Sequence, residues 1–376
     1  MISSPLGYLA VITLLATLFY QLEKKSGWRL FEYFPGIVLI YIYAMVLSSL
    51  NIIEQNEAIS SVYKTTKNNL LPAMLFLMLL SVDIKQFLRL GRKLLIAFSG
   101  AVISMMIAFI TVFYLFSFNL DESTLFGALS GSWMGGTANM IAIASALGTS
   151  ENMMGYALVV DAVDYTLWVM FLLVIVKFAK KFNSWSRAEE VQTNQTLELG
   201  CACTIETKEY YKLIGLSLLV AFFSNIVSTK LPFLSSTTWL VLIATVLGII
   251  GSFTPLRRLN GSVQVGSTML YLLVALIGSR ASLEGIDSVP TYIFAGILIL
   301  VIHGVLMAIL AKVFKLDLFS ISVASLSCVG GVASAPILAA TYDKSLVAIA
   351  VLMAIAGYLV GTFSGLLVGN ILKLIA

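Results

Sequence analysis

The chain alternates long apolar runs with short polar segments along its whole length. A run of about 20 apolar residues is long enough to cross the hydrocarbon core of a membrane as a helix. Continuous apolar character also excludes a membrane β-barrel, whose strands alternate between apolar and polar positions. The pattern predicts membrane-crossing helices at residues 6–20, 35–50, 70–82, 94–118, 155–178, 211–227, 237–250, 262–279, 292–313 and 346–372.

Two further apolar segments, residues 125–147 and 319–340, are each interrupted by a pair of glycines. A constant shift of 195 residues, without gaps, places Gly135-Gly136 on Gly330-Gly331. The same shift pairs Ser130 with Ser325, Ser132 with Ser327, Asn139 with Ser334 and Asp161 with Ala356. The chain is therefore predicted to consist of two related halves, each with a broken helical segment inside the membrane.

The distribution of basic residues indicates whether the two glycine-broken segments cross the membrane. Cytoplasmic loops carry an excess of Lys and Arg, and residues 24–29, 85–93 and 177–181 are basic. If residues 125–147 crossed the membrane, the second and third of these stretches would lie on opposite sides. The conflict disappears if the broken segment is a re-entrant hairpin, and the same rule applied to residues 319–340 inverts the second half. A broken helix that crosses completely stays open as an alternative.

The predicted fold is an all-α polytopic membrane protein with two inverted structural repeats, about ten transmembrane helices and two broken, re-entrant segments. Residues 1–182 form the first membrane half and residues 210–376 the second. Residues 183–209 are polar, lack apolar periodicity and are expected to form a cytoplasmic linker.

Composition agrees with a membrane protein and excludes several function classes. Of the 376 residues, 59% are hydrophobic and 11% are charged, whereas a soluble domain has about 25% charged residues. The net charge of +4 gives no reason to expect nucleic acid, since basic residues here mainly set orientation. Cys201, Cys203 and Cys328 have no disulfide or zinc spacing. With one histidine and no P-loop, we expect neither an enzyme nor an ATP-driven pump, and no cofactor beyond a bound sodium ion.

The glycine-broken segments are the first candidate site. A helix broken inside a bilayer exposes backbone groups that only protein or a water-filled cavity can satisfy. Freed carbonyls can coordinate a cation, and helix N-termini can hold an anionic group. The alternative is that small residues merely allow close helix packing. The candidate solute- and ion-binding residues are Ser132, Gly135, Gly136, Thr137, Asn139, Ser327, Cys328, Gly330, Gly331 and Ser334.

Asp161 and Asp164 are the second candidate site. They lie three residues apart in one apolar run, hence on one helix face. A carboxyl group at this depth is costly and usually functional, so both can exchange a proton or sodium, and Asp161 is the candidate sodium ligand. The alternative is an interfacial or capping aspartate. His303, inside another run, could relay protons or be hydrogen-bonded across a helix interface.

The stretches LSGSWMGGTANMIAIASALG, VVDAVDYTLW and SCVGGVASAP resemble the DUF819 family of bacterial membrane proteins. That family is distantly similar to sodium-coupled glutamate and citrate carriers, and to the cation/proton antiporter and bile-acid symporter fold group. VVDAVDYTLW also looks like the carboxylate helix of sodium/proton antiporters. The resemblance implies a secondary transporter in the bacterial inner (cytoplasmic) membrane. Related carriers often dimerise through a scaffold domain, so a homodimer is compatible with it.

The leading hypothesis is an ion-coupled secondary transporter that moves a small polar, anionic solute with sodium or protons by alternating access. Its expected partners are this solute, the coupling cation and the lipid bilayer. The alternative is a cation/proton antiporter without an organic substrate, which the pair Asp161 and Asp164 favours. A channel fits less well than a transporter, because paired inverted repeats with broken helices are typical of alternating access.

Overall fold

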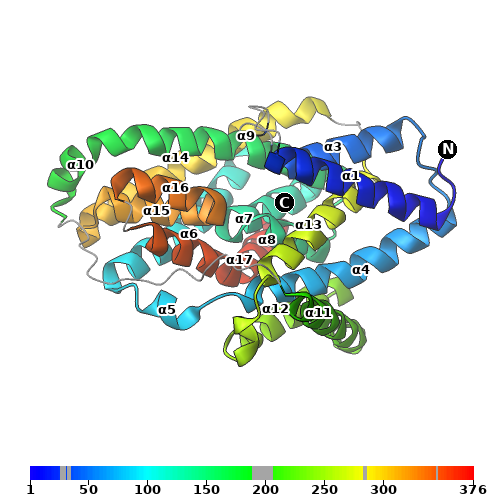
Figure 1. The fold of residues 1–376 in the computed structure, drawn as a ribbon. Helices are drawn as coiled ribbons and strands as arrows, with labels where there is room; N and C mark the ends of the chain where they lie inside the picture. Colours follow the sequence, from blue (N-terminus) through cyan, green and yellow to red (C-terminus); the bar gives the residue numbers. More distant parts are fainter. Residues whose placement is uncertain (26–30, 32–34, 189–205, 283–285, 344–345) are drawn as a thin grey trace.

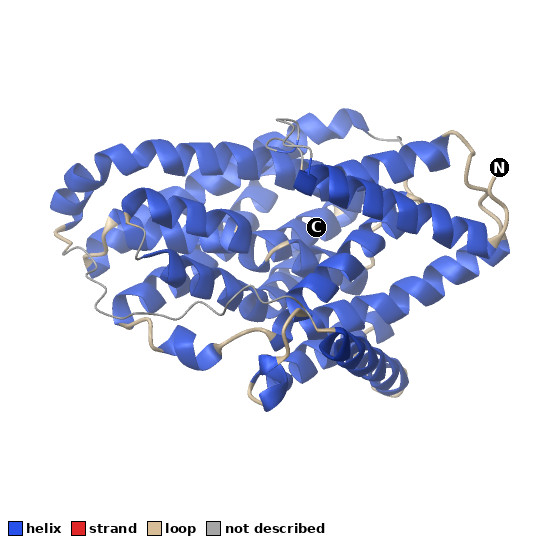
Figure 2. Ribbon diagram, in the orientation of Figure 1, coloured by secondary structure: helices blue, strands red, loops and turns tan. Residues whose placement is uncertain are grey.

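A computed structural model describes residues 1–25, 31, 35–188, 206–282, 286–343 and 346–376. Throughout these residues the regular structure is helical (Figure 2), apart from one isolated bridge between Ile2 and Ile53. The longer helices are α1 (Pro5–Lys25), α3 (Gly36–Ser49), α4 (Glu57–Leu80), α6 (Arg92–Phe116), α9 (Glu151–Ile175), α11 (Thr207–Ser228), α12 (Ser236–Ser252), α13 (Ser262–Gly278), α14 (Val289–Phe314) and α17 (Val347–Ile375).

The predicted multi-pass helical membrane protein is confirmed at the level of helix length and composition. Within the described ranges, six helices are long and apolar enough to cross a membrane: α1, α6, α9, α11, α14 and α17. Several shorter apolar helices accompany them, among them α3, α12 and α13. The segments that contain the two glycine pairs are not membrane-length helices, because each segment is divided into two helices at its glycine pair.

Each glycine pair separates two short helices. In the first half α7 (Leu120–Gly135) is followed by α8 (Thr137–Leu147), and in the second half α15 (Leu318–Val329) is followed by α16 (Gly331–Tyr342). Gly136 has φ +82° and Gly331 has φ +59°. These are left-handed conformations that glycine adopts without the steric cost that a side chain would bring. The breaks therefore fall where the sequence predicts them.

The second helix of each pair folds back along the first. Gly127, midway along α7, lies against Leu147 at the end of α8, so closely that an added Cβ would be 2.6 Å from Leu147 Cδ1. Phe319, near the start of α15, packs on Tyr342 at the end of α16, with ring centroids 5.4 Å apart. These contacts are those of antiparallel helical hairpins, and we call α7–α8 the first hairpin and α15–α16 the second hairpin.

The helices form two groups that lie side by side (Figure 1). One group, which we call the scaffold, contains α1, α3, α4, α11, α12 and α13, and the other contains both hairpins with α6, α9, α14 and α17. Within the first group α4 packs on α13, and within the second α6 packs on α14. The first hairpin and α17 lie between the two ends of the molecule, and α8 makes the largest contact with the scaffold, through α12.

Glycines form the closest helix contact of the second group. On α7, Gly127, Gly131 and Gly135 face Gly369, Gly365 and Gly361 of α17, in antiparallel order. An added Cβ on Gly135 would be 2.6 Å from the Cα of Gly361, and one on Gly365 would be 2.9 Å from the Cα of Gly131. Small residues at four-residue spacing allow such close approach of backbones in membranes. The first hairpin is thereby fixed to a helix from the other half of the chain.

The third apolar helix, predicted at residues 70–82, begins earlier than predicted, because α4 begins at Glu57. The Asn56 side chain accepts a hydrogen bond of 2.9 Å from the backbone N–H of Ile59 and so caps the helix. Ile59 and Tyr63 then bury one face of this polar first part. Capping and a few buried side chains extend the helix through a segment whose composition resembles a loop.

The helix that carries Asp161 and Asp164 also continues further than the predicted residues 155–178. A single turn, η1 (Val176–Phe178), joins α9 to α10 (Ala179–Ser186), which reaches into the segment predicted to be a linker. There Asn183 Oδ1 accepts a hydrogen bond of 2.8 Å from the backbone N–H of Leu318. The start of this segment therefore caps the second hairpin. Residues 189–205, including Cys201 and Cys203, lie outside the described residues.

Candidate functional site

The two hairpin breaks meet at one point on α17. An added Cβ on Gly357 would be 3.4 Å from the carbonyl oxygen of Met134 and 3.5 Å from that of Ser327. Met134 lies in the last turn of α7, and Ser327 lies in the last turn of α15. The final carbonyls of a helix lack intrahelical partners and form the negative end of its dipole. Two such ends from different halves of the chain thus converge beside Gly357.

Asp161 on α9 is bonded to the first hairpin. Its Oδ1 accepts a hydrogen bond of 2.8 Å from Trp133 Nε1. The hydroxyl of Ser132 lies 3.1 Å from Oδ1 and 3.2 Å from Oδ2. The Trp133 side chain is fully buried, whereas Asp161 is partly exposed. The last turn of α7 therefore orients this carboxylate.

Asp164 lies in a different environment, one turn further along α9. Its side chain is 0% exposed, and neither carboxyl oxygen has a hydrogen-bond partner among the described residues. Oδ2 lies directly against the backbone of Gly296 on α14, where a β-carbon would clash with it. A buried polar group without a partner destabilises the fold, and a carboxyl group inside a membrane is usually functional, so Asp164 is a candidate ligand-binding group.

Tyr165 extends the same helix face to the second hairpin. An added Cβ on Gly330 would be 2.6 Å from Tyr165 Cε2. Tyr165 follows Asp161 by four residues, so both lie on one side of α9. The helix therefore contacts the break of the first hairpin through Asp161 and the break of the second through Tyr165. Sequence reasoning missed Tyr165 and Trp133, although the four-residue spacing from Asp161 was a usable signal for the tyrosine.

The remaining predicted residues are distributed around the two breaks. The Asn139 amide donates hydrogen bonds of 2.7 Å to the carbonyl of Gly135 and 3.3 Å to that of Tyr358. Its oxygen accepts a hydrogen bond from the Thr362 hydroxyl, so this side chain holds the first hairpin against α17. The other polar candidates differ in burial: Ser327, Cys328 and Ser334 are buried, and Thr137 is half-buried.

His303 belongs to a buried network outside this cluster. Trp168 Nε1 donates to Ser325 Oγ at 2.9 Å, and Ser325 Oγ lies 2.8 Å from His303 Nε2. His303 Nδ1 lies 2.8 Å from Ser104 Oγ, which donates to the Ala101 carbonyl at 3.0 Å. Because Ser104 uses its one proton there, it accepts from Nδ1–H, and Nε2 accepts from Ser325. A neutral histidine with every polar atom bonded matches the predicted alternative of a histidine hydrogen-bonded across a helix interface.

We expect Ser325→Ala to destabilise the protein by about 1–3 kcal/mol, because it leaves the Trp168 N–H and His303 Nε2 buried without partners. Ser130→Ala is the matched control. Ser130 occupies the corresponding position of the first half and bonds only the Gly127 carbonyl of its own helix among the contacts described, at 2.7 Å. Thermal unfolding in detergent should show a large decrease for the first variant and a small one for the second. Equal decreases would contradict the network.

Two broken-helix hairpins packed among membrane-length helices define the chain as a multi-pass α-helical membrane protein. Its sequence matches the family described as protein of unknown function (DUF819) over residues 10–375, and the chain belongs to this family. It is also similar to the uncharacterized membrane protein YjcL of Bacillus subtilis (strain 168). The two are 26% identical over 388 aligned positions, which cover 97% of this chain and 95% of YjcL.

Proposed function

We propose that the protein is an ion-coupled secondary transporter of a small polar, anionic solute. The observation that carries the proposal is the meeting of Met134 and Ser327, from the two hairpin breaks, beside Gly357. Discontinuous helices that meet inside the membrane are a recurring design for binding a solute together with its coupling ion.

The local charges support a cation beside an anionic solute. The C-terminal ends of α7 and α15 and the carboxylate of Asp161 favour a cation, sodium or a proton. The helices α8 and α16 begin at the same two breaks, and their N-termini favour an anionic group. Asp161 is the proposed sodium ligand, and the position shifted by 195 residues is Ala356, so the cation site would be asymmetric between the halves.

The order of the helices supports a transport cycle by alternating access. A long helix, a hairpin and another long helix follow one another in both halves, as α6 to α9 and as α14 to α17. We propose that these halves are inverted repeats, that the hairpins move relative to the scaffold, and that two copies pair through the scaffold. Residues 183–209 would lie on the cytoplasmic side of the bacterial inner membrane.

The test is stabilisation by sodium of the purified protein in liposomes. A ligand that binds only the folded state raises its stability, by about 2.7 kcal/mol at a concentration of 100 Kd. We expect sodium to raise the melting temperature of the native chain and not that of Asp161→Asn. Asp121→Asn is the control, because it removes an exposed carboxylate at the start of α7. No effect of sodium on the native chain would reject the sodium site and leave proton coupling to be tested.

A cation/proton antiporter without organic substrate is the second candidate. Asp164, one turn from Asp161, favours it: its carboxyl group is fully buried and has no hydrogen-bond partner within the part of the chain that the structure describes. Two adjacent carboxyl groups can exchange protons for a cation. Proton efflux driven by a sodium gradient alone, recorded as internal pH, would support this candidate. Solute uptake that stops when the ion gradient is removed would support the transporter.

A further inference from the structure

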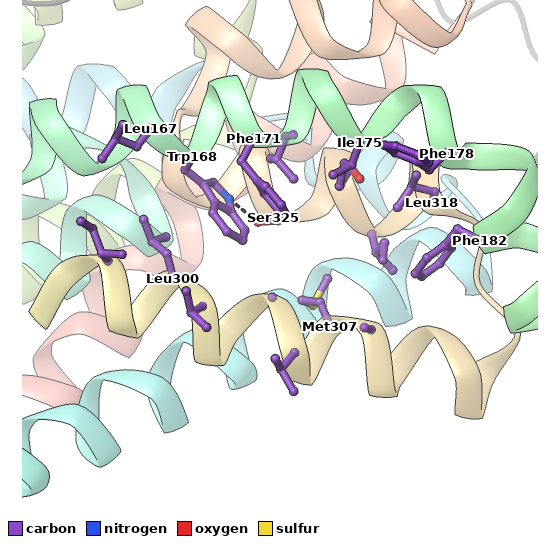
Figure 3. A pocket seen from close by; sticks show the side chains of 18 residues that line it. Leu167, Trp168, Phe171, Ile175, Phe178, Phe182, Leu300, Met307, Leu318 and Ser325 are labelled. Carbon is purple, nitrogen blue, oxygen red and sulfur yellow. Dashed lines mark hydrogen bonds between the residues drawn. The ribbon is translucent and has the colours of Figure 1, made fainter. Parts of the chain in front are cut away.

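An apolar groove lies on the side of the molecule away from the scaffold, between α9, α14 and α15. Its volume is about 650 Å³. Phe171 of α9 lies on one wall, and Leu300 and Met307 of α14 lie on the facing wall (Figure 3). Phe171 is 49% exposed and Val305 is 55% exposed. Since α9 and α14 are both membrane-length helices, these exposed apolar walls are suited to contact with lipid.

One end of the groove is aromatic and basic. Phe178 and Phe182 line it there, and the Phe182 ring lies 5.3 Å from the Trp185 ring. Lys312 of α14 donates a hydrogen bond to the Trp185 carbonyl and lies 5.0 Å from the centroid of its ring. Tryptophan is typical of the level of lipid headgroups. This end therefore marks the membrane interface, and the rest of the groove extends into the apolar core.

Exposed lysines cluster at this end of the groove. Lys177, Lys180 and Lys181 flank the lining residues Phe178 and Phe182 in sequence, and all three are exposed. Of the acids near α10, Asp343 is exposed and lines a small pocket together with Ala179 and Asn183. Asp317 is buried, and its carboxylate accepts a hydrogen bond of 3.1 Å from the backbone N–H of Ser320. It thus caps α15 and is directed away from solvent. Basic clusters next to intramembrane grooves bind the phosphate of anionic lipids.

We propose that this groove binds one acyl chain of an anionic phospholipid, with the lipid phosphate held by Lys177 of η1, Lys180 and Lys181 of α10, and Lys312 of α14. The apolar walls match the chain, and the basic end matches the headgroup. The site is distinct from the proposed transport site, because none of its lining residues belongs to the cluster around Asp161 and Gly357. A bound lipid would fill the space between α9 and α14 that the protein itself leaves open.

The test uses phosphatidylglycerol with brominated acyl chains, added stepwise to vesicles of phosphatidylcholine that contain the protein. Bromine quenches tryptophan fluorescence on contact, and the Trp168 ring lines the groove. We expect a saturable quenching component with a roughly fivefold preference for phosphatidylglycerol over brominated phosphatidylcholine. Equal quenching by both lipids, or quenching that only follows the bulk lipid fraction, would overturn the proposal.

Two pairs of variants locate the site. Ala308→Phe fills the groove and should remove the saturable component, whereas Ile309→Phe, at the next residue of α14 but outside the lining, should retain it. The double variant Lys180→Gln and Lys181→Gln should lose the preference for phosphatidylglycerol. The same change at Lys208 and Lys212, exposed on α11, should preserve it. A saturable component that survives in Ala308→Phe would also overturn the proposal.

Discussion

Replacing Gly361 by alanine is expected to destabilise the protein by at least about 3 kcal/mol, which is the upper range for adding a methyl group to a tightly packed position. A β-carbon on Gly361 would collide with the Cα of Gly135 and be 2.9 Å from its backbone nitrogen. Backbone atoms cannot rotate aside as a flexible side chain can, so α7 and α17 would have to separate. Separation would displace the first hairpin from Gly357 and disrupt the proposed transport site as well.

Gly215 provides the control for this substitution. It also lies within a long helix, α11, but an added β-carbon there would have no heavy atom within 4 Å. Alanine favours the helical state over glycine by about 1 kcal/mol, so Gly215→Ala should be neutral or slightly stabilising. The measurement is the yield of monodisperse protein and its melting temperature in detergent. Equal behaviour of the two variants would show that the α7–α17 contact is not close-packed.

Sequence reasoning predicted the broken helices well because the information is local. Gly135-Gly136 and Gly330-Gly331 interrupt apolar runs, and glycine can adopt the left-handed conformations found at Gly136 and Gly331. The extension of α4 was missed for a different reason. Its first part is polar, and its helical state depends on burying Ile59 and Tyr63 against other elements, which composition alone does not reveal.

The candidate site was less predictable because it depends on which helices pack against one another. Ser132 and Asp161 were both chosen from sequence, and they are bonded in the structure. The role of Gly357 could not be derived from the 195-residue shift, since it depends on α7 of one half packing against α17 of the other. The glycines of both helices recur every four residues, which indicates a close packing face but does not identify the partner.

The two aspartates should respond in opposite ways to the same substitution. Asp164→Leu is expected to stabilise the protein by about 1–3 kcal/mol, because it removes a buried carboxyl group that has no hydrogen-bond partner among the described residues. Asp161→Leu is expected to destabilise it by about 1–3 kcal/mol, because the Trp133 N–H and the Ser132 hydroxyl lose their acceptor. Melting temperatures of both variants, measured without sodium, give this comparison.

Transport by the same two variants tests why Asp164, whose carboxyl group has no partner among the residues described, lies at this depth. A side chain that lowers stability persists when function requires it, so Asp164→Leu should be more stable than the native chain and yet lose ion-driven flux in liposomes. A destabilised but active Asp164→Leu would contradict this, because the carboxyl group would then contribute to folding and not to transport. If both stability and flux increased, Asp164 would have no role in the transport cycle, and Asp161 alone would be the candidate ion ligand.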